Sequence, residues 1–159
     1  MLKGKLHIGG GTWGSIMALP FAFILLLVAK FPYGHVVYLM AVAVIMFAGV
    51  ASIPATEACL GLQKNWRGKM VQHDQSQIVI DEVWGIMITA WPLLWINPCN
   101  WWIAMSLVFV LFRFFDITKI WPINLLDRWE NEWGVMLDDG MAGVYAAVSL
   151  VVINCFFHF

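Results

Sequence analysis

The chain has 159 residues, of which 62% are hydrophobic and only 12% are charged. A soluble globular domain is nearer half apolar and a quarter charged, so this composition excludes an ordinary soluble domain and also a disordered or fibrous chain. Nine basic and ten acidic residues give a formal net charge of −1, which excludes the strongly basic surface of a protein that binds nucleic acid.

Five segments are long and apolar enough to be helices that cross the ~30 Å hydrocarbon layer, which needs about 20 residues. Every backbone N–H and C=O inside hydrocarbon must be bonded within its own segment, so these segments should be helical. We predict a single all-α domain over residues 1–159, an integral membrane bundle with about five transmembrane helices and cytoplasmic loops. The predicted helices are residues 16–30, 35–54, 78–96, 101–118 and 139–157.

Five spans place alternate loops on opposite faces of the membrane. Eight of the nine basic residues then lie on the face of the N-terminus, and only Lys30 lies on the other. Because loops rich in Lys and Arg stay in the cytoplasm, we predict a cytoplasmic N-terminus. All ten acidic residues fall on this same face. The opposite face carries a tryptophan cluster typical of an interfacial anchor: Trp91, Trp95, Trp101 and Trp102.

The first segment that could carry chemistry is the glycine-rich run before the first span, residues 9–15. Glycines let a backbone approach a ligand closely, and a helix N-terminus presents unpaired N–H groups. Thr12 and Ser15 add hydroxyl groups, so the run could hold a phosphate. A flexible entry turn with Ser15 as the helix N-cap explains the same residues and is the simpler interpretation of this segment alone.

Asp81 and Glu82 stand at the start of the third predicted span, after His73 and Asp74 in the preceding loop. The helix macrodipole favours acidic residues at a helix N-terminus, which explains them without a function. Carboxylates where a helix enters lipid are nevertheless unfavourable unless they bind a cation or face water. The sequence supports both interpretations equally.

Arg113, Asp116 and Lys119 lie about one helical turn apart at the end of the fourth span. A simple ion pair, with basic side chains reaching the headgroups, explains this pattern. Ionisable residues inside a span are also candidates for function. In that interpretation Asp116 is a metal ligand, and Arg113 and Lys119 face an anionic substrate.

Asp138 and Asp139 precede the fifth span, and Gly140 and Gly143 follow them. Acidic residues at a helix start again suggest capping, while glycines allow a neighbouring helix to come close. Four or five carboxylates on one rim would repel one another unless a divalent cation neutralised them. Oxygen ligands without a Cys/His set favour Mg²⁺, Mn²⁺ or Ca²⁺ over zinc. Mg²⁺ usually takes only one or two protein carboxylates, so the additional acidic residues indicate either two metal ions or a separate base for the attacking water.

These motifs resemble, in order and over nearly the whole chain, the phosphatidylglycerophosphatase A family. The residues that carry the resemblance are Thr12-Trp13-Gly14-Ser15, His73-Asp74 with Ile80-Asp81-Glu82, Phe112-Arg113 with Asp116, Lys119 and Trp121-Pro122, and Gly134-Val135-Met136-Leu137-Asp138-Asp139 with Ala142-Gly143. Gly10 and Ile120 stand where the family usually has proline. Both departures change the backbone and leave the polar residues in place.

The resemblance implies a Mg²⁺-dependent phosphatase of the bacterial inner membrane. Such an enzyme hydrolyses the terminal phosphate of phosphatidylglycerophosphate and gives phosphatidylglycerol and inorganic phosphate. The implied metal ligands, for one or two Mg²⁺ ions, are Glu82, Asp116, Asp138 and Asp139. Asp81 is implied as a ligand or base, and with Asp116 and Asp139 it makes up the catalytic set. The implied phosphate-binding residues are Thr12, Ser15, Arg113 and Lys119.

The implied partners are the lipid substrate and membrane lipids, with no nucleic acid, while the oligomeric state and any role of His7, Glu57, His73 or Asp74 stay open. Two other classes of protein are weaker alternatives. A CDP-alcohol phosphotransferase is matched only by Asp139-Gly140. A cation transporter or a non-catalytic membrane protein would place its acids near the midplane, often in repeated halves, and this chain shows no repeat.

Overall fold

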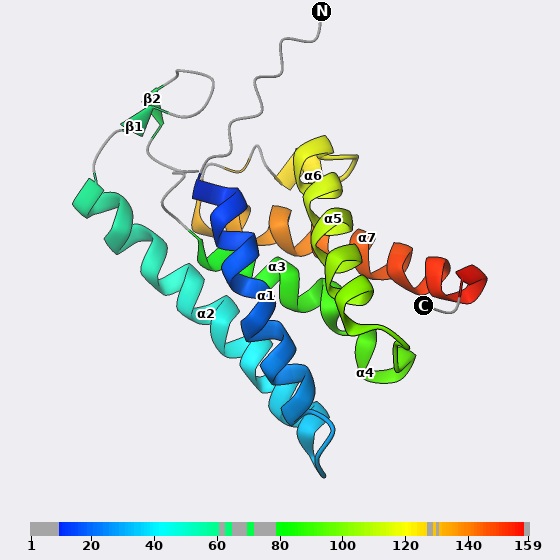
Figure 1. The fold of residues 1–159 in the computed structure, drawn as a ribbon. Coiled ribbons are helices and arrows are strands. Elements are labelled where there is room, and N and C mark those ends of the chain that lie inside the picture. Colours follow the sequence, from blue (N-terminus) through cyan, green and yellow to red (C-terminus); the bar gives the residue numbers. More distant parts are fainter. Residues whose placement is uncertain are drawn as a thin grey trace, which may run out of the picture.

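A computed structural model describes residues 10–60, 63–64, 70–71, 79–126, 129 and 131–157. These residues form a helical bundle (Figure 1), so the predicted all-α class is confirmed. The helices are α1 (Gly10–Val28), α2 (Gly34–Leu60), α3 (Ile80–Ala90), α4 (Leu93–Ile96), α5 (Trp101–Thr118), α6 (Ile123–Leu126) and α7 (Glu132–Phe157). Two short strands, β1 (Gln63–Lys64) and β2 (Met70–Val71), pair antiparallel in the connection between α2 and α3.

Three helices of the described residues are long and apolar enough to cross a membrane. They are residues 34–55 of α2, the whole of α5 and the whole of α7. Helix α1 is apolar too, although its apolar part, Thr12–Val28, is shorter. Helix α2 continues past Pro54, where the prediction ended it, to Leu60. Four of the five predicted spans therefore correspond to single helices.

The prediction of one helix over residues 78–96 is wrong. Helix α3 ends at Ala90, and Pro92, which has no backbone N–H to donate, separates it from α4. Eleven residues rise only about 16 Å, roughly half of the hydrocarbon layer. Helix α3 can be this short because α1, α2, α5 and α7 all contact it. Its start, with Asp81 and Glu82, therefore lies against protein and not against lipid alone.

Helices α3 and α7 cross at glycine residues. A Cβ atom added to Gly143 would lie 2.6 Å from the carbonyl oxygen of Gly85, and one added to Gly140 would overlap the ring of Trp84. Thr89 donates a hydrogen bond from Oγ1 to the Gly85 carbonyl at 2.9 Å, and the Gly143 carbonyl lies 3.4 Å from the same hydroxyl. The missing side chains let the two backbones approach closely, which holds the acidic start of α3 near Asp138 and Asp139 of α7.

Helix α7 begins earlier than predicted. Asn131 precedes it and accepts a hydrogen bond on Oδ1 from the backbone N–H of Gly134 at 2.7 Å, the usual bond of an N-cap side chain. The helix therefore begins at Glu132, and Asp138 and Asp139 lie well inside it. The predicted start at residue 139 is wrong, and these two aspartates cannot serve as the helix cap.

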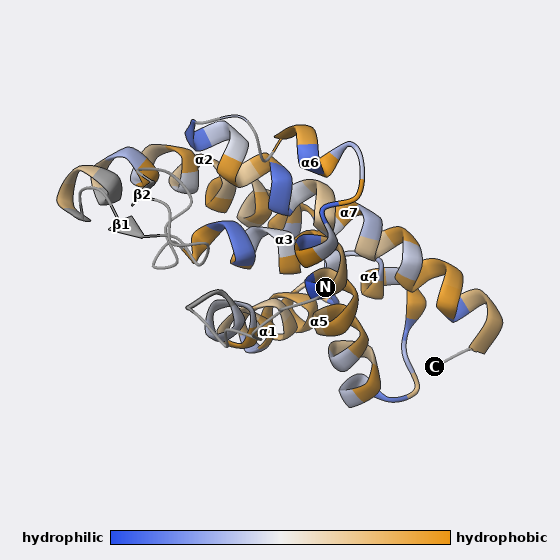
Figure 2. Cartoon of the chain, turned by 90° about the horizontal axis from the view of Figure 1, so that it is seen from above, coloured by the Kyte–Doolittle hydropathy of each residue, from blue (hydrophilic) through white to orange (hydrophobic). Residues whose placement is uncertain are grey.

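Helices α1 and α2 run in opposite directions, α5 leads back from α4 toward the start of α1, and α7 lies across the bundle (Figure 1). The carboxylate end comprises Asp81, Glu82, Asp116, Asp138 and Asp139, near the starts of α1, α3 and α7 and the end of α5. The tryptophan end comprises Trp91, Trp95, Trp101 and Trp102, beside the connection between α1 and α2. Seen from above in Figure 2, short hydrophilic stretches lie among helices that are otherwise mostly hydrophobic.

The close contact of α3 and α7 at Gly143 predicts that an alanine there destabilises the protein more than an alanine at Gly49 of α2. Ala in place of Gly normally stabilises a helix by about 1 kcal/mol. We expect Gly143→Ala to lower the melting temperature of the detergent-solubilised protein, because the new Cβ meets a backbone oxygen that cannot move aside. Gly49→Ala is the matched control, since its Cβ would overlap only the end of the flexible Met136 side chain and would touch Ile80 at an ordinary contact distance of 3.4 Å. A melting temperature for Gly143→Ala at or above that of Gly49→Ala would contradict this packing.

Candidate active site

Glu82 joins three helices at the carboxylate end. Its residue is only 7% exposed, at the start of α3. The Ser15 hydroxyl of α1 donates to Oε2 at 3.3 Å, and Nη1 of Arg113 of α5 lies 3.4 Å from Oε1. Gly14 makes room for this carboxylate, because a Cβ at that position would overlap Glu82 and Val79. The Gly14-Ser15 pair thus forms part of the surface that receives Glu82.

Arg113 bridges two carboxylates within the bundle. Besides Glu82, its Nη1 atom donates to Oδ2 of Asp116 at 2.7 Å, across one turn of α5. The predicted intrahelical pair therefore forms, but it is shared with another helix. An arginine has five N–H donors, so these two contacts leave capacity for an anionic ligand.

Lys119 connects the end of α5 to α7. It adopts a left-handed conformation with φ of 43°, and its N–H donates to the Phe115 carbonyl at 2.9 Å, which ends α5. Its ammonium group donates to Oδ2 of Asp138 at 2.7 Å. Asp138 is 7% exposed and lies inside α7. A charge-assisted pair of this kind is stronger than a neutral hydrogen bond and fixes the position of the loop cation.

Asp139 and Asp81 have no basic partner among the residues that the structure describes. Asp139 is 6% exposed, and no described residue donates a hydrogen bond to its carboxylate. It lies close enough to Asp81, Glu82, Asp116 and Asp138 for their charges to repel it. Asp81 accepts the backbone N–H of Glu82 at 2.8 Å on Oδ1. Among the described residues, five carboxylates face two basic side chains at this end, and such an excess of acidic groups in a largely apolar surrounding favours binding of a cation.

The structure brings together most of the residues that the sequence analysis selected. Those gathered at one end are Asp81, Glu82, Arg113, Asp116, Lys119, Asp138 and Asp139. Thr12 lies half-buried in the first turn of α1. His7, His73 and Asp74 lie outside the described residues, as does the side chain of Glu57.

The glycine-rich run differs from the prediction. Helix α1 already begins at Gly10, so residues 10–15 are helical and not a flexible turn. Ser15 is fully buried in the second turn and is not an N-cap. Its hydroxyl donates to Glu82, which makes it a residue that positions a carboxylate. A direct contact of Ser15 or Thr12 with phosphate stays a prediction.

The donor chemistry of the carboxylate end fits a hard dication such as Mg²⁺, because every candidate ligand is a carboxylate oxygen. The described residues do not place three Asp, Glu, His or Cys side chains close enough for a ready-made metal site. Mg²⁺ needs only one or two protein carboxylates and keeps water on its other positions. Asp139, buried without a donor, is the residue that best fits such a ligand.

Two features of the site were missed from the sequence. The first is the N-cap at Asn131, which places Asp138 and Asp139 inside α7. Its only signal in the sequence is an Asn three residues before a Gly, and this pattern is weak. The second is the space that two glycines leave for side chains of other helices: Gly14 makes room for Glu82, and Gly85 makes room for Phe112. These roles depend on which helices are neighbours. No local pattern in one sequence specifies that.

Comparison with known proteins gives consistent matches. A family model described as phosphatidylglycerophosphatase A matches residues 1–154. A phosphatidylglycerophosphatase A of Haemophilus influenzae is 34% identical over 154 residues, 96% of this chain and 83% of the relative. One of Escherichia coli is 33% identical, over 96% of this chain and 78% of the relative. A Bacteroides thetaiotaomicron protein, named provisionally as a phosphatidylinositol-3-phosphatase, is 31% identical over 90% of this chain and 79% of its own. No solved structure matches.

Asp138 has a basic partner, Lys119, whereas the adjacent Asp139 has none among the described residues. This difference can be tested by measuring the stability of variants in the absence of ligand. We expect Asp139→Asn to raise the melting temperature of the metal-free protein, because it removes a buried charge that lacks a donor and is repelled by its neighbours. Asp138→Asn is the matched control and should lower it, since it weakens the ion pair with Lys119. Equal shifts in the two variants, measured in detergent with chelator, would contradict the assigned partners.

Proposed function

This chain belongs to the phosphatidylglycerophosphatase A family, and from that premise we propose that it hydrolyses the terminal phosphate monoester of phosphatidylglycerophosphate at the carboxylate end. The observation that carries the proposal is the joining of α3, α5 and α7 through acidic and basic side chains at one end of an apolar bundle. A phosphorylated lipid could present its headgroup there while its acyl chains stay in the bilayer.

Exposed aromatic side chains support this position of the substrate. Trp121 and Trp129, in the connection between α5 and α7, are both largely exposed beside the site. Tryptophan prefers the level of the lipid headgroups. The Tyr145 hydroxyl of α7 donates to the Trp121 carbonyl at 3.3 Å, which holds this connection near the bundle. The site would then lie at the depth where a headgroup phosphate is found.

We propose Mg²⁺, as one or two ions, for the carboxylate end. Asp139 and Asp81 are the first ligand candidates because no described Arg or Lys pairs with them. Glu82, Asp116 and Asp138 lie nearby and would complete the ligand set or hold its water molecules. A bound dication supplies charge neutralisation at the phosphoryl oxygens and activation of water.

The side chains of the chain divide the remaining tasks of the reaction. Arg113 and Lys119 would bind the non-bridging phosphate oxygens with donors that their carboxylate pairs leave unused. In-line attack of water forms a new P–O bond and breaks the bond between phosphorus and the glycerol oxygen. Asp81 would accept the proton of the attacking water, and the glycerol oxygen would take a proton from solvent as it leaves. Ser15 would keep Glu82 in position.

The location proposed is the bacterial inner membrane, with the carboxylate end in the cytoplasm. Its support is the distribution of basic residues, since eight of nine belong to the face of the N-terminus.

Phosphate release from defined lipids tests the activity and the substrate together. We expect purified protein with Mg²⁺ to release phosphate from phosphatidylglycerophosphate faster than from phosphatidic acid, and to stop with chelator. A third sample with a phosphatidylinositol phosphate is included because one relative bears that provisional name. No release with any divalent metal would refute the enzyme proposal, and equal rates on all three lipids would refute the headgroup preference.

Two substitutions test the assigned carboxylates. We expect Asp139→Asn and Asp116→Asn each to reduce turnover by at least about a hundredfold, the scale for losing a group that acts on charge in the transition state. Glu132→Gln is the matched control, because Glu132 lies in the first turn of α7 outside the carboxylate cluster. Full turnover in either aspartate variant, or a similar loss in the control, would overturn the assignment. Each variant is first checked for insertion and a monodisperse elution profile.

A further inference from the structure

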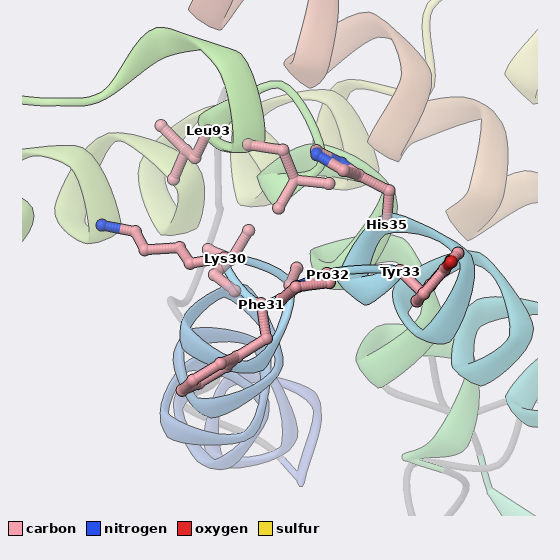
Figure 3. A pocket seen from close by; sticks show the side chains of 9 residues that line it. Lys30, Phe31, Pro32, Tyr33, His35 and Leu93 are labelled. Carbon is pink, nitrogen blue, oxygen red and sulfur yellow. The ribbon is translucent and has the colours of Figure 1, made fainter.

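A cavity of about 440 Å³ lies at the tryptophan end, away from the candidate active site (Figure 3). The last turn of α1, the connection of residues 31–33, the start of α2 and the short helix α4 form its walls. Fifteen residues of α1 and its extension separate Ser15 from Lys30, a rise of about 22 Å, so the two sites are distinct. The volume lies within the usual range for small-molecule pockets.

Among the residues that line this cavity, Lys30 carries the one formal charge, and that charge is positive. Lys30 and His35 line it from the two ends of the α1–α2 connection, and none of its lining residues is acidic. The backbone adds no net preference for either sign, because the positive end of the α2 dipole at Gly34 and the negative end of the α1 dipole meet at this connection. The carboxylates of the described site residues lie at the opposite end of the bundle. This end of the molecule therefore favours an anion.

Aromatic rings hold both titratable side chains. The Lys30 ammonium lies 4.8 Å from the centroid of the Trp101 ring, in a cation–π contact. The His35 ring stacks on Trp95, with centroids 6.4 Å apart and planes 12° apart. These contacts keep the two groups at the level of the tryptophan cluster, which is the expected depth of lipid headgroups.

The inner wall of the cavity is apolar. Leu26 of α1 and Leu93 of α4 are almost fully buried there, and Leu94 beside Leu93 is half-buried. A cationic rim above an apolar wall matches the two parts of a phospholipid, a phosphate followed by acyl chains. A small soluble anion would use only the rim.

We propose that this cavity binds the phosphate of an anionic phospholipid headgroup in the leaflet opposite the candidate active site. The inference needs the chain to span a membrane, and it does not depend on the phosphatase activity. The chemistry shared with a free phosphate ion is the oxyanion. Apolar contact with Phe31 and Leu94, which line the cavity and are accessible from it, would distinguish the lipid.

Retention of lipid by the purified protein, measured by native mass spectrometry from micelles, tests the proposal. The probes are phosphatidylserine, zwitterionic phosphatidylcholine and, in a separate sample, inorganic phosphate. We expect the protein to retain phosphatidylserine in preference to phosphatidylcholine. Lys30→Gln should lower the affinity for phosphatidylserine about fivefold, and adding His35→Gln should lower it further. Lys30→Arg is the matched control that keeps the charge. Leu94→Trp, which fills the cavity without changing charge, should also lower retention.

Each outcome decides between the possibilities. Unchanged melting temperatures and elution profiles of the variants would show that they fold. Equal retention by the wild type and the Lys30→Gln/His35→Gln variant, or no preference for phosphatidylserine, would overturn the site. Displacement of the lipid by millimolar inorganic phosphate, lost with the same two substitutions, would keep the anion site and overturn the lipid as its ligand.

Discussion

Carboxylates placed among apolar helices need compensation, and two basic side chains at the end of α5 supply it. Arg113 reaches Glu82 of α3 and Asp116 of its own helix, and Lys119 reaches Asp138 of α7. An ion removed from water without a partner is strongly unfavourable, so these pairs constrain how α3, α5 and α7 can be arranged. Among the described residues, these pairs leave Asp139 and Asp81 without a basic partner, and these are the two carboxylates for which we propose Mg²⁺ first.

The short helix α3 makes this arrangement possible. A helix that crossed the whole bilayer would bring its polar start to the edge of the bundle, whereas α3 lies inside a ring of four other helices. Small residues at its crossing with α7 allow the two helices to approach closely. The Thr89 hydroxyl lies within hydrogen-bond distance of a backbone carbonyl of each helix, Gly85 of α3 and Gly143 of α7. The acids of α3 and α7 are thus held by backbone packing, and their separation is set before any ligand binds.

The two ends of the bundle carry opposite chemistry. One end combines carboxylates with two basic side chains and suits a phosphorylated substrate together with a dication. The other combines Lys30 and His35 with a tryptophan cluster and suits an anionic headgroup alone. Exposed tryptophans occur at both, Trp121 and Trp129 in the connection after α5 and Trp95 and Trp102 in the tryptophan cluster, and tryptophan prefers the level of the lipid headgroups.

The sequence alone determined the apolar helical class, the alternation of loops and the collection of Asp81, Asp116 and Asp139 at one end, because these follow from composition and the length of apolar runs. Tertiary structure decided that α3 is a half-length interior helix and that Ser15 serves Glu82. It also decided that Asp138 and Asp139 lie within α7, because the cap at Asn131 outweighs the change in polarity that marked the predicted start. Which helices become neighbours depends on the packing of several segments at once, and that information is not contained in any one of them.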